Sequence, residues 1–523
     1  MAVNIVTAQE AAQLLKDSDI VLVGGSAGMG VADTILEQIG LLFQNEQRPK
    51  NLTILHTTGV GAVTEKGLNH LVHKGLVKRV IGGNFGLQLP FMKELIINNE
   101  IEAYNFPQGV MCQLYRAMAG GQPGVVSHVG LNTFMDPRLE GGKMNSATKK
   151  DLIEVVELAG NEYLFYPSQL PDVALIRGTT ADEDGNVSLE HEAATLDALS
   201  MAQAAHNAGG KVICQIERMA QRNTLHPQMA KIPGFLIDYF VIQPEQMQNF
   251  AVRFDPSRCG ALERPIDLIK PDSLDVRRLI ARRAAFELKR GAVINLGVGV
   301  SAAIPNVLAE EEADKLVHLT IEAGVIGGVP GQGLHFGSAI NPRVILDQGY
   351  MFDFYDGGGL DIAFVSFAEV DSSGNVNVTR FGNRNDGAGG FINITQNAKV
   401  IVFSGTLTGG GLDVEVSQDG IIINREGSIS KFVNKVGQIS YNGKIGLESG
   451  QKCVFITERA VFHLTTQGLL MTEIAPGVDM EMEVLNVIDF DIKVSRDIKE
   501  MDRRLFKEGK MGLTSWMLEN EKS

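Results

Sequence analysis

The sequence predicts an α/β protein made of two related open α/β domains that arose by internal duplication. Short runs of Val and Ile lead through glycines into helical stretches, as in IVLVGG before residues 26–38 and AVINLGVG before residues 302–312. Strand, turn and helix in this order are typical of a largely parallel sheet. In addition, segments 172–187 and 361–376 align without a gap and share six of sixteen residues. A duplicated unit is the simplest explanation of that match.

Each aligned segment ends in D-x-x-G-N-V, which predicts a tight turn between two apolar runs. Two shorter echoes follow the same order along the chain. GGSAG at Gly24 resembles LGVG at Leu296, and the tripeptide LTI occurs at 52–54 and again at 319–321. The LTI match aligns Leu55 with Glu322, so only one of the two copies has an acid at this position.

The duplication suggests how the chain divides. We expect an N-terminal half over 1–253, a linker over 254–273 and a C-terminal half over 274–523. The linker contains Asp-Pro, Arg-Pro and Lys-Pro pairs, which favour extended chain. A helix should follow it at 274–289.

Composition excludes several classes of function. With 523 residues the chain is too long for one ordinary core, and its net charge of −15 argues against nucleic acid or an anionic membrane as a partner. Neither a signal peptide nor a run of about 18 apolar residues is present, so we expect a cytoplasmic protein. The four cysteines are far apart with no CxxC pair, which predicts neither a disulfide framework nor a metal site. They are Cys112, Cys214, Cys259 and Cys453.

Glu322 is the strongest candidate for chemistry. It follows the apolar run HLTI and precedes Gly324, Gly327 and Gly328. Open α/β sheets build their sites at the carboxyl ends of parallel strands, and nearby glycines leave room for a ligand. A glutamate side chain is ionised at neutral pH and is able to act as a nucleophile. The alternative interpretation is that Glu322 caps the turn or pairs with a cation.

Two glycine-rich turns are candidate sources of backbone hydrogen-bond donors. The stretch GAGG at 387–390 offers closely spaced amides of the kind that stabilise an oxyanion. The turn NLGVG at 295–299 lies between a strand and a helix and could direct amides at phosphate or carbonyl oxygens. Many such turns only close a tight connection. VGGSAGMG does not match G-x-G-x-x-G, and H-E-x-x-H is absent.

Several longer motifs resemble a known family. They are IEAGVIGGVP at 321–330, FYDGGGLD at 354–361, GAGGF at 387–391, EAYNFPQG from Glu102 and ITERAVFHLT from Ile456. Over essentially its whole length the chain resembles the family I coenzyme A transferases, and within them the fused, single-chain acetate and propionate (short-chain acyl) enzymes. The resemblance implies two related α/β halves with the active site between them.

The resemblance also implies roles for single residues. Glu322 would be the nucleophile that becomes a glutamyl-CoA thioester. The oxyanion and CoA would be contacted by Gly297, Val298 and Gly299 and by Gly387, Gly389 and Gly390.

The implied reaction transfers CoA between a short-chain acyl-CoA and a free carboxylate such as acetate, propionate or butyrate, with ping-pong kinetics. CoA would be a substrate, with no permanently bound cofactor and no metal. The enzyme would be a homo-oligomer, either a dimer or a tetramer. The alternatives are an acyl-CoA hydrolase on the same scaffold and a non-catalytic sensor of acyl-CoA or sugar phosphate.

Overall fold

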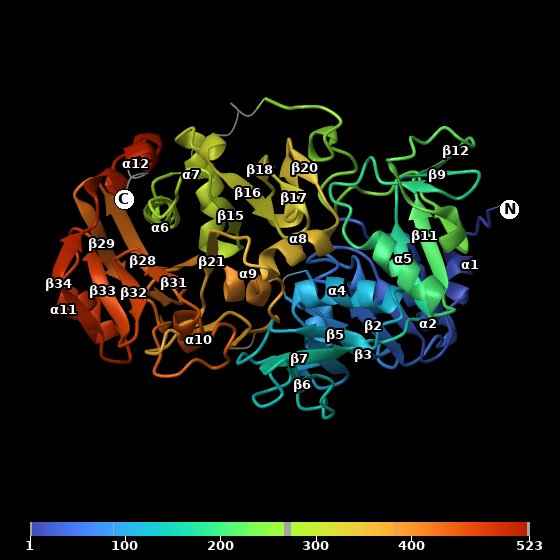
Figure 1. Ribbon diagram of the computed structural model, residues 1–523, viewed down its shortest axis with the longest axis horizontal. Coiled ribbons are helices and arrows are strands. Elements are labelled where there is room, and N and C mark those ends of the chain that lie inside the picture. The colour runs from blue at the N-terminus through green and yellow to red at the C-terminus, as the bar shows by residue number, and fades with distance from the viewer. Residues whose placement is uncertain (1–2, 87, 266–272, 383, 520–523) are drawn as a thin grey trace. The chain divides into compact units, whose positions relative to one another are not determined.

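The computed structural model describes residues 3–86, 88–265, 273–382 and 384–519. They form two compact units, each discontinuous in sequence (Figure 1). Unit 1 lies within residues 1–264, 321–353 and 384–393, and unit 2 within residues 265–320, 354–383 and 394–523. Unit 1 therefore contains two segments of the C-terminal half of the chain. Residues 266–272 of the predicted linker lie outside the described residues, and the division of the chain at 254–273 stays a prediction.

A seven-stranded sheet with parallel neighbours forms the centre of unit 1. In spatial order its strands are β14 (Tyr239–Ile242), β11 (Lys211–Ile216), β8 (Val173–Arg177), β1 (Ile20–Val23), β2 (Leu52–His56), β3 (Val77–Gly82) and β4 (Glu102–Asn105). Strands β2 and β8 are buried along their whole length. Both faces of the sheet must therefore be covered, which explains their continuous apolar sequences.

Helices cover this sheet, and α4 and α5 lie side by side (Figure 1). The helices with residues in unit 1 are α1 (Ala8–Gln13), α2 (Asp33–Glu46), α3 (Pro90–Ile97), α4 (Gln108–Ala119), α5 (Ala198–Asn207) and the first parts of α8 (Gln348–Asp356) and α9 (Phe391–Asn397). Its smaller strands are β5 (Gly124–Ser127), β6 (Glu154–Leu158), β7 (Asn161–Pro167), β9 (Thr180–Asp182), β10 (Val187–Ser188), β12 (Arg218–Ala220), β13 (Ala230–Ile232), β17 (Val325–Ile326), β18 (Val329–Pro330), β19 (Ala339–Ile340), β20 (Val344–Ile345) and β25 (Arg384–Asn385).

Unit 2 is built on a second sheet, in which the strands from β16 to β31 are parallel, β32 and β33 are antiparallel, and β34 is parallel to β33. Eight of the ten strands of this sheet have residues in unit 2, in the order β16 (His318–Ile321), β15 (Val293–Leu296), β21 (Ile362–Ser366), β26 (Val400–Ser404), β31 (Lys452–Ile456), β32 (Ala460–Thr465), β33 (Gly468–Ile474) and β34 (Lys493–Glu500). The remaining strands are β22 (Glu369–Val370), β23 (Val376–Asn377), β24 (Arg380–Phe381), β27 (Thr408–Gly409), β28 (Asp413–Ser417), β29 (Gly420–Arg425) and β30 (Ile429–Ser430). The helices are α6 (Val276–Ala285), α7 (Ile304–Glu310), α9 (Phe391–Asn397), α10 (Gly443–Glu448), α11 (Met480–Glu483) and α12 (Leu513–Glu519).

The predicted helix ranges agree with the observed helices to different degrees. Helices α6 and α7 lie inside the ranges 274–289 and 302–312 that the sequence predicts. The helix expected at 26–38 begins only at Asp33. Before it, Ser26 and Met29 exchange two backbone hydrogen bonds of 3.0 and 2.9 Å, which close a turn where the pattern predicted helix.

The internal duplication is visible in the two sheets. The parallel order β11-β8-β1-β2 of unit 1 matches β26-β21-β15-β16 of unit 2. Asp172, just before β8, accepts a 2.8 Å hydrogen bond from the amide of Ile20 on the adjacent β1. Asp361, just before β21, accepts a 2.8 Å bond from the amide of Val293 on β15 in the same way. The predicted relationship between the halves is therefore confirmed strand by strand.

The two D-x-x-G-N-V turns also have the same hydrogen bonds. In each, Oδ1 of Asp182 or Asp371 accepts from the amides two and four residues ahead, at 2.9 to 3.1 Å. In each, Nδ2 of the asparagine (Asn186 or Asn375) donates to the other carboxylate oxygen at 3.1 Å. The aspartate thus holds the turn, which explains why this segment is so similar in both copies.

The register of the strands corrects one sequence expectation. Thr53 on β2 and His318 on β16 are equivalent, since each pairs with the first residue of its neighbouring strand β1 or β15. Four residues further along lie Thr57 and Glu322. The counterpart of Glu322 is therefore Thr57 and not Leu55. A slip of two residues keeps every side chain on the same face of the strand, so the LTI pattern does not reveal it.

A buried ion pair braces the carboxyl edge of the unit 1 sheet. Arg177, the last residue of β8, makes two hydrogen bonds of 2.9 and 2.6 Å to the carboxylate of Glu192. The two side chains are 2% and 4% exposed, and Arg177 also donates to three backbone carbonyls. Removing one partner would leave the other charge buried and unpaired.

We therefore expect Glu192→Ala to lower the free energy of unfolding by about 3–5 kcal/mol. Thermal melting followed by circular dichroism measures the effect. The matched control is Glu245→Ala, which breaks a 3.0 Å pair with Arg253 in which both side chains are more than half exposed. That change should cost less than about 1 kcal/mol. Equal melting temperatures for the two variants would contradict the assignment.

Candidate active site

Glu322 lies on a tightly packed turn. It follows directly on β16, and only 9% of the residue is exposed. Its neighbours Ile321 and Ala323 are buried in an apolar cluster with Met29, Ala193, Ala194 and Leu196 of the N-terminal half. The carboxylate is thus carried on a backbone that is anchored on both sides.

Gly324 allows the chain to turn immediately after the acid. Its φ is +96°, and a Cβ added there would lie 2.1 Å from the carbonyl oxygen of Leu346. The amide of Leu346 donates to the carbonyl of Gly324 at 2.8 Å, and the amide of Gly324 donates to Ile321 at 2.9 Å. Only glycine fits this position, which explains the E-A-G order in the sequence.

The predicted glycine loop at 387–390 packs within unit 1, at the carboxyl edge of β3 and β4. Gly387 and Gly389 both have positive φ, +78° and +56°. The amide of Ala388 donates to Oδ1 of Asn105 at 2.8 Å, and the amide of Gly389 donates to the carbonyl of Gly83 at 2.6 Å. Among the described residues we find no hydrogen bond from the amides of Gly387 and Gly390. These two amides, and not that of Gly389, are the donors that the loop could offer to a ligand.

Asn105 holds this loop in place, a role the sequence analysis did not find. Its Nδ2 donates to the carbonyls of Gly82 and Gly83 at 2.7 and 2.6 Å while its Oδ1 accepts from Ala388. Asn84 adds a 3.3 Å bond from its Nδ2 to the carbonyl of Gly387. The only signal in the sequence was that Asn105 belongs to the motif EAYNFPQG.

Burial shifts the pKa of three groups at this edge of the sheet. His56 is fully buried against Phe85, and desolvation lowers its pKa to about 4, so the ring is neutral at physiological pH. Burial raises the pKa of Asp197 to about 6 and raises that of the Cys112 thiol well above its ordinary value. Cys112 is therefore a thiol and is not poised as a nucleophile.

The other predicted turn, Gly297 to Gly299, belongs to unit 2 and follows β15. The amide of Gly297 is already bonded to the carbonyl of Phe364 at 2.8 Å, as in a continued strand. The Ser366 hydroxyl donates to the carbonyl of Val298 at 2.9 Å and accepts from the amide of Val300 at 3.1 Å. Gly299 has a φ of +87°, and the Val298 residue is 60% exposed. The turn therefore presents Val298 outward.

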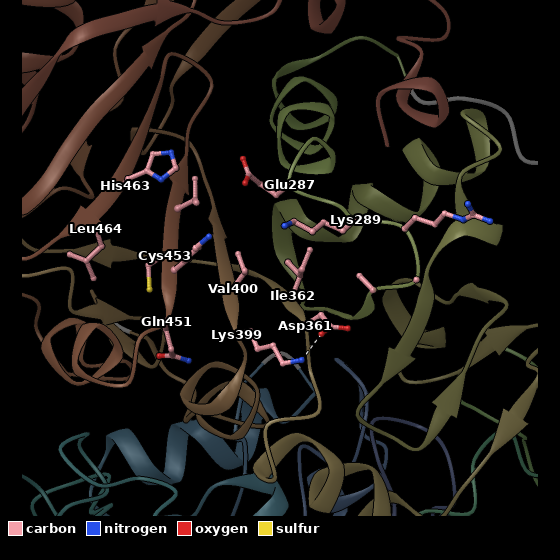
Figure 2. A pocket seen from close by; sticks show the side chains of 15 residues that line it. Glu287, Lys289, Asp361, Ile362, Lys399, Val400, Gln451, Cys453, His463 and Leu464 are labelled. Carbon is pink, nitrogen blue, oxygen red and sulfur yellow. Dashed lines mark hydrogen bonds and ion pairs between the residues drawn. The ribbon is translucent and has the colours of Figure 1, made fainter. Parts of the chain in front are cut away.

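A cavity of about 780 Å³ lies at the amino edge of the unit 2 sheet (Figure 2). Lys289, Lys399 and Lys452 line it, and Lys399 is bonded to Asp361 at 2.7 Å. Helices α6, α9 and α10 end shortly before these lysines, and cations are favourable near the carbonyl ends of helices. None of the predicted site residues lines this cavity, which opens at the edge opposite to Gly297.

Comparison with known proteins decides the family. Residues 5–243 match the family described as coenzyme A transferase. The chain is 44% identical over 514 residues to the acetate CoA-transferase YdiF of Escherichia coli K12, a match that covers 98% of this chain and 96% of the relative. The chain belongs to the coenzyme A transferase family.

Other members of the family agree with this assignment. The chain is 40% identical over 525 residues to the caffeate CoA-transferase of Acetobacterium woodii, covering 98% and 99% of the two chains. It superposes on the crystal structure of the acyl-CoA transferase YdiF apoenzyme of E. coli O157:H7 with a TM-score of 0.94, at 42% identity over 98% and 97% of the chains. A structure of that protein described as a thioester complex with CoA gives 0.92, with the same identity and coverage.

The predicted family I, single-chain type is thus confirmed, together with the α/β fold and the assignment as an enzyme that transfers CoA. In the described parts of the chain no three His, Cys, Asp or Glu side chains gather in a way that could hold a metal ion. Within the same residues, no helix combines the length and apolar character needed to cross a membrane. The roles of single residues in this transferase remain predictions.

Asn105→Ala should loosen the glycine loop and destabilise unit 1. The change leaves the buried Ala388 amide without a partner and removes one of the two hydrogen bonds that each carbonyl of Gly82 and Gly83 accepts, so we expect a loss of about 1–3 kcal/mol. Asn161→Ala is the control, because within the described residues its side chain makes a single hydrogen bond, an exposed one of 3.4 Å to the carbonyl of Ala159. Melting temperatures measure both variants. The role assigned to Asn105 is wrong if Asn105→Ala has the same melting temperature as the Asn161→Ala control.

Proposed function

We propose that this coenzyme A transferase moves CoA between short-chain acyl-CoA and free short-chain carboxylates through a covalent intermediate on Glu322. The observation that carries the proposal is the position of Glu322, at the carboxyl end of β16 on a turn that is locked by packing and by Gly324. A nucleophile on a rigid backbone loses little freedom on reaching the transition state. The low exposure of the residue also limits access by water, which would hydrolyse an activated intermediate.

The duplication supports placing the glycine loop close to Glu322. Asp197 directly precedes α5 and Gly390 directly precedes α9, and these helices lead into the equivalent strands β11 and β26. Thr57 is the counterpart of Glu322. In the first copy Thr57 and Asp197 are in contact, since the hydroxyl donates to the carboxylate at 2.9 Å. By the same arrangement, the loop that precedes α9 and contains Gly387 and Gly390 would lie near Glu322.

The proposed reaction has four steps. The Glu322 carboxylate attacks the acyl-CoA carbonyl and displaces CoA thiolate, which leaves an acyl-glutamyl anhydride. The thiolate attacks the glutamyl carbonyl, so that the first acid leaves and CoA is held as a thioester. The second carboxylate attacks the glutamyl carbonyl of this thioester, displaces CoA thiolate and forms a new anhydride. The thiolate then attacks the acyl carbonyl of that anhydride, which releases the new acyl-CoA and restores the carboxylate.

Each tetrahedral intermediate places negative charge on an oxygen. In unit 1 the proposed donors are the amides of Gly387 and Gly390, and one such donor is worth about 3 kcal/mol of transition-state stabilisation. We propose that Val298 and Gly299 of unit 2 contact CoA, with Gly297 closing their turn. Gly389 acts on the loop itself through its bond to Gly83.

The relatives inform the choice of substrate. One is named for acetate and another for caffeate, so members similar to this chain differ in the acid they are named for. The thioester complex described for YdiF supports a covalent step in this chain as well. We propose acetate, propionate and butyrate as acids, no permanently bound cofactor, a cytoplasmic location and a homo-oligomer. Initial rates with acetate, propionate, butyrate and caffeate as acceptors test the acid preference.

Incubation with acetyl-CoA in the absence of an acceptor acid should leave a CoA-sized adduct on the peptide that contains Glu322. Peptide mass spectrometry detects it. Glu322→Gln should abolish the adduct and lower kcat/KM for transfer by more than about a thousandfold, because the nucleophile is gone while the fold remains.

Glu448→Gln is the matched control, since Glu448 is more than half exposed and, in the part of the chain that the structure describes, has a single 3.7 Å pair with Lys444. It should keep wild-type rates. Release of CoA from acetyl-CoA, measured with and without propionate, separates transfer from hydrolysis. Turnover that ignores propionate would make the chain a hydrolase, and a wild-type enzyme without the adduct would overturn the role of Glu322.

A further inference from the structure

Asp197 is a buried carboxylate surrounded by neutral donors. Its Oδ2 accepts from the Thr57 hydroxyl at 2.9 Å and from Nε2 of Gln348 at 2.8 Å, and the Cys112 thiol lies 3.8 Å away. The residue is 6% exposed, and in the described part of the chain no cation pairs with it. Although it directly precedes α5, its side chain does not cap that helix. A buried carboxylate is costly, so its donors have to offset a considerable desolvation penalty.

Gln348 connects this carboxylate to the glycine loop. The residue is fully buried at the start of α8, and its Oε1 accepts from Nε2 of Gln108 at 3.1 Å. The amide of Gln108 in turn donates to the carbonyl of Gly389 at 2.9 Å. A short path of hydrogen bonds therefore leads from Asp197 through two glutamine side chains to the loop at 387–390.

Gln348 is also tied to the turn of Glu322. Leu346, two residues before it, donates its amide to the carbonyl of Gly324 at 2.8 Å. The backbone amide of Gln348 donates to Leu196 at 3.1 Å, and Leu196 belongs to the apolar cluster that flanks Glu322. The backbone of Gln348 is thus linked to the turn of Glu322, and its side chain is linked to the loop at 387–390.

The charge on Asp197 fixes which group donates and which accepts in this path of hydrogen bonds. An ionised carboxylate only accepts hydrogen bonds, so the NH₂ group of Gln348 has to face Asp197 and its oxygen has to face Gln108. Gln108 must then present its NH₂ group to Gln348. Its own Oε1 is left on the side of Gly389, 3.8 Å from where a Cβ of that residue would be. One charged group thereby sets the orientation of two amides.

We propose that Asp197 and Gln348 are positioning residues for CoA transfer, which hold the turn of Glu322 and the loop of Gly387 and Gly390 at a fixed spacing. The inference rests on the proposed function, because it takes these two elements as nucleophile and oxyanion donors. A displacement of about 1 Å between reacting groups can cost about a hundredfold in rate. Neither residue contacts the reacting atoms in this scheme.

The test uses two full-length variants, Asp197→Asn and Gln348→Met. The first removes the acceptor-only group and the second keeps the length of the side chain but removes its hydrogen bonds. We expect kcat for transfer between acetyl-CoA and propionate to fall about 10- to 100-fold in each. KM for acetyl-CoA should stay within about twofold, since CoA contacts are unchanged. In a quenched time course, the Glu322 adduct should still form but at the reduced rate.

Gln451→Met is the matched control. Gln451 is also a buried glutamine with two hydrogen bonds from Nε2, to the carbonyls of Thr395 and Ala398 at 2.9 and 2.6 Å, but it lies in unit 2. It should lower the melting temperature without slowing adduct formation. If Gln348→Met or Asp197→Asn does not fold, Thr57→Val is measured instead, with an expected loss of about threefold from one lost hydrogen bond.

The inference is overturned if the folded variants form the adduct at the wild-type rate, or if Gln451→Met, with a similar loss of melting temperature, slows adduct formation to the same extent. Failure of the proposed function is a separate result. In that case the wild-type enzyme forms no adduct on Glu322 at all, and the positioning role falls with it.

Discussion

The hydrogen bonds of Asn105 are the interaction on which the candidate site depends. One side chain satisfies two carbonyls at the end of β3 and one amide of a segment that lies about 280 positions further along the chain. The buried Ala388 amide has Asn105 as its partner, and each of the two carbonyls would lose one of its two hydrogen bonds without Asn105, which would cost free energy. The loop at 387–390 consequently belongs to unit 1, although its sequence lies in the C-terminal half.

Residues 321–353 also lie in the C-terminal half of the chain but belong to unit 1. The cluster around Ile321 and Ala323 buries apolar side chains from both halves, and Gln348 extends the contact with polar groups. Apolar packing carries most of the stabilisation of such a contact but does not define its exact spacing. The directed hydrogen bonds from Gln348 to Asp197 and Leu196 fix the spacing that apolar packing alone does not fix.

Duplication explains how the site became asymmetric. Thr57 and Glu322 occupy the same register position in the two copies, and Asp197 and Gly390 precede equivalent helices. In one copy the pair is a hydroxyl and a carboxylate bonded to each other, which is a structural arrangement. In the other copy the same register position holds the carboxylate of Glu322, and the residue before the equivalent helix is Gly390, which has no side chain. The two copies therefore differ in the side chains they carry at corresponding places.

The pattern of residues by itself determined the α/β class, the repeat and the position of Glu322, because strand, glycine and helix recur in a local order and the acid interrupts it at a strand end. The motifs also predicted the family. Tertiary structure alone decided that Thr57 is the counterpart of Glu322 and that the Gly389 amide is occupied. It also decided that Asn105 is bonded to Ala388 and that Asp197 is bonded to Gln348. These facts depend on which strands pair and which distant backbone groups need a partner, and neither is written in the local sequence.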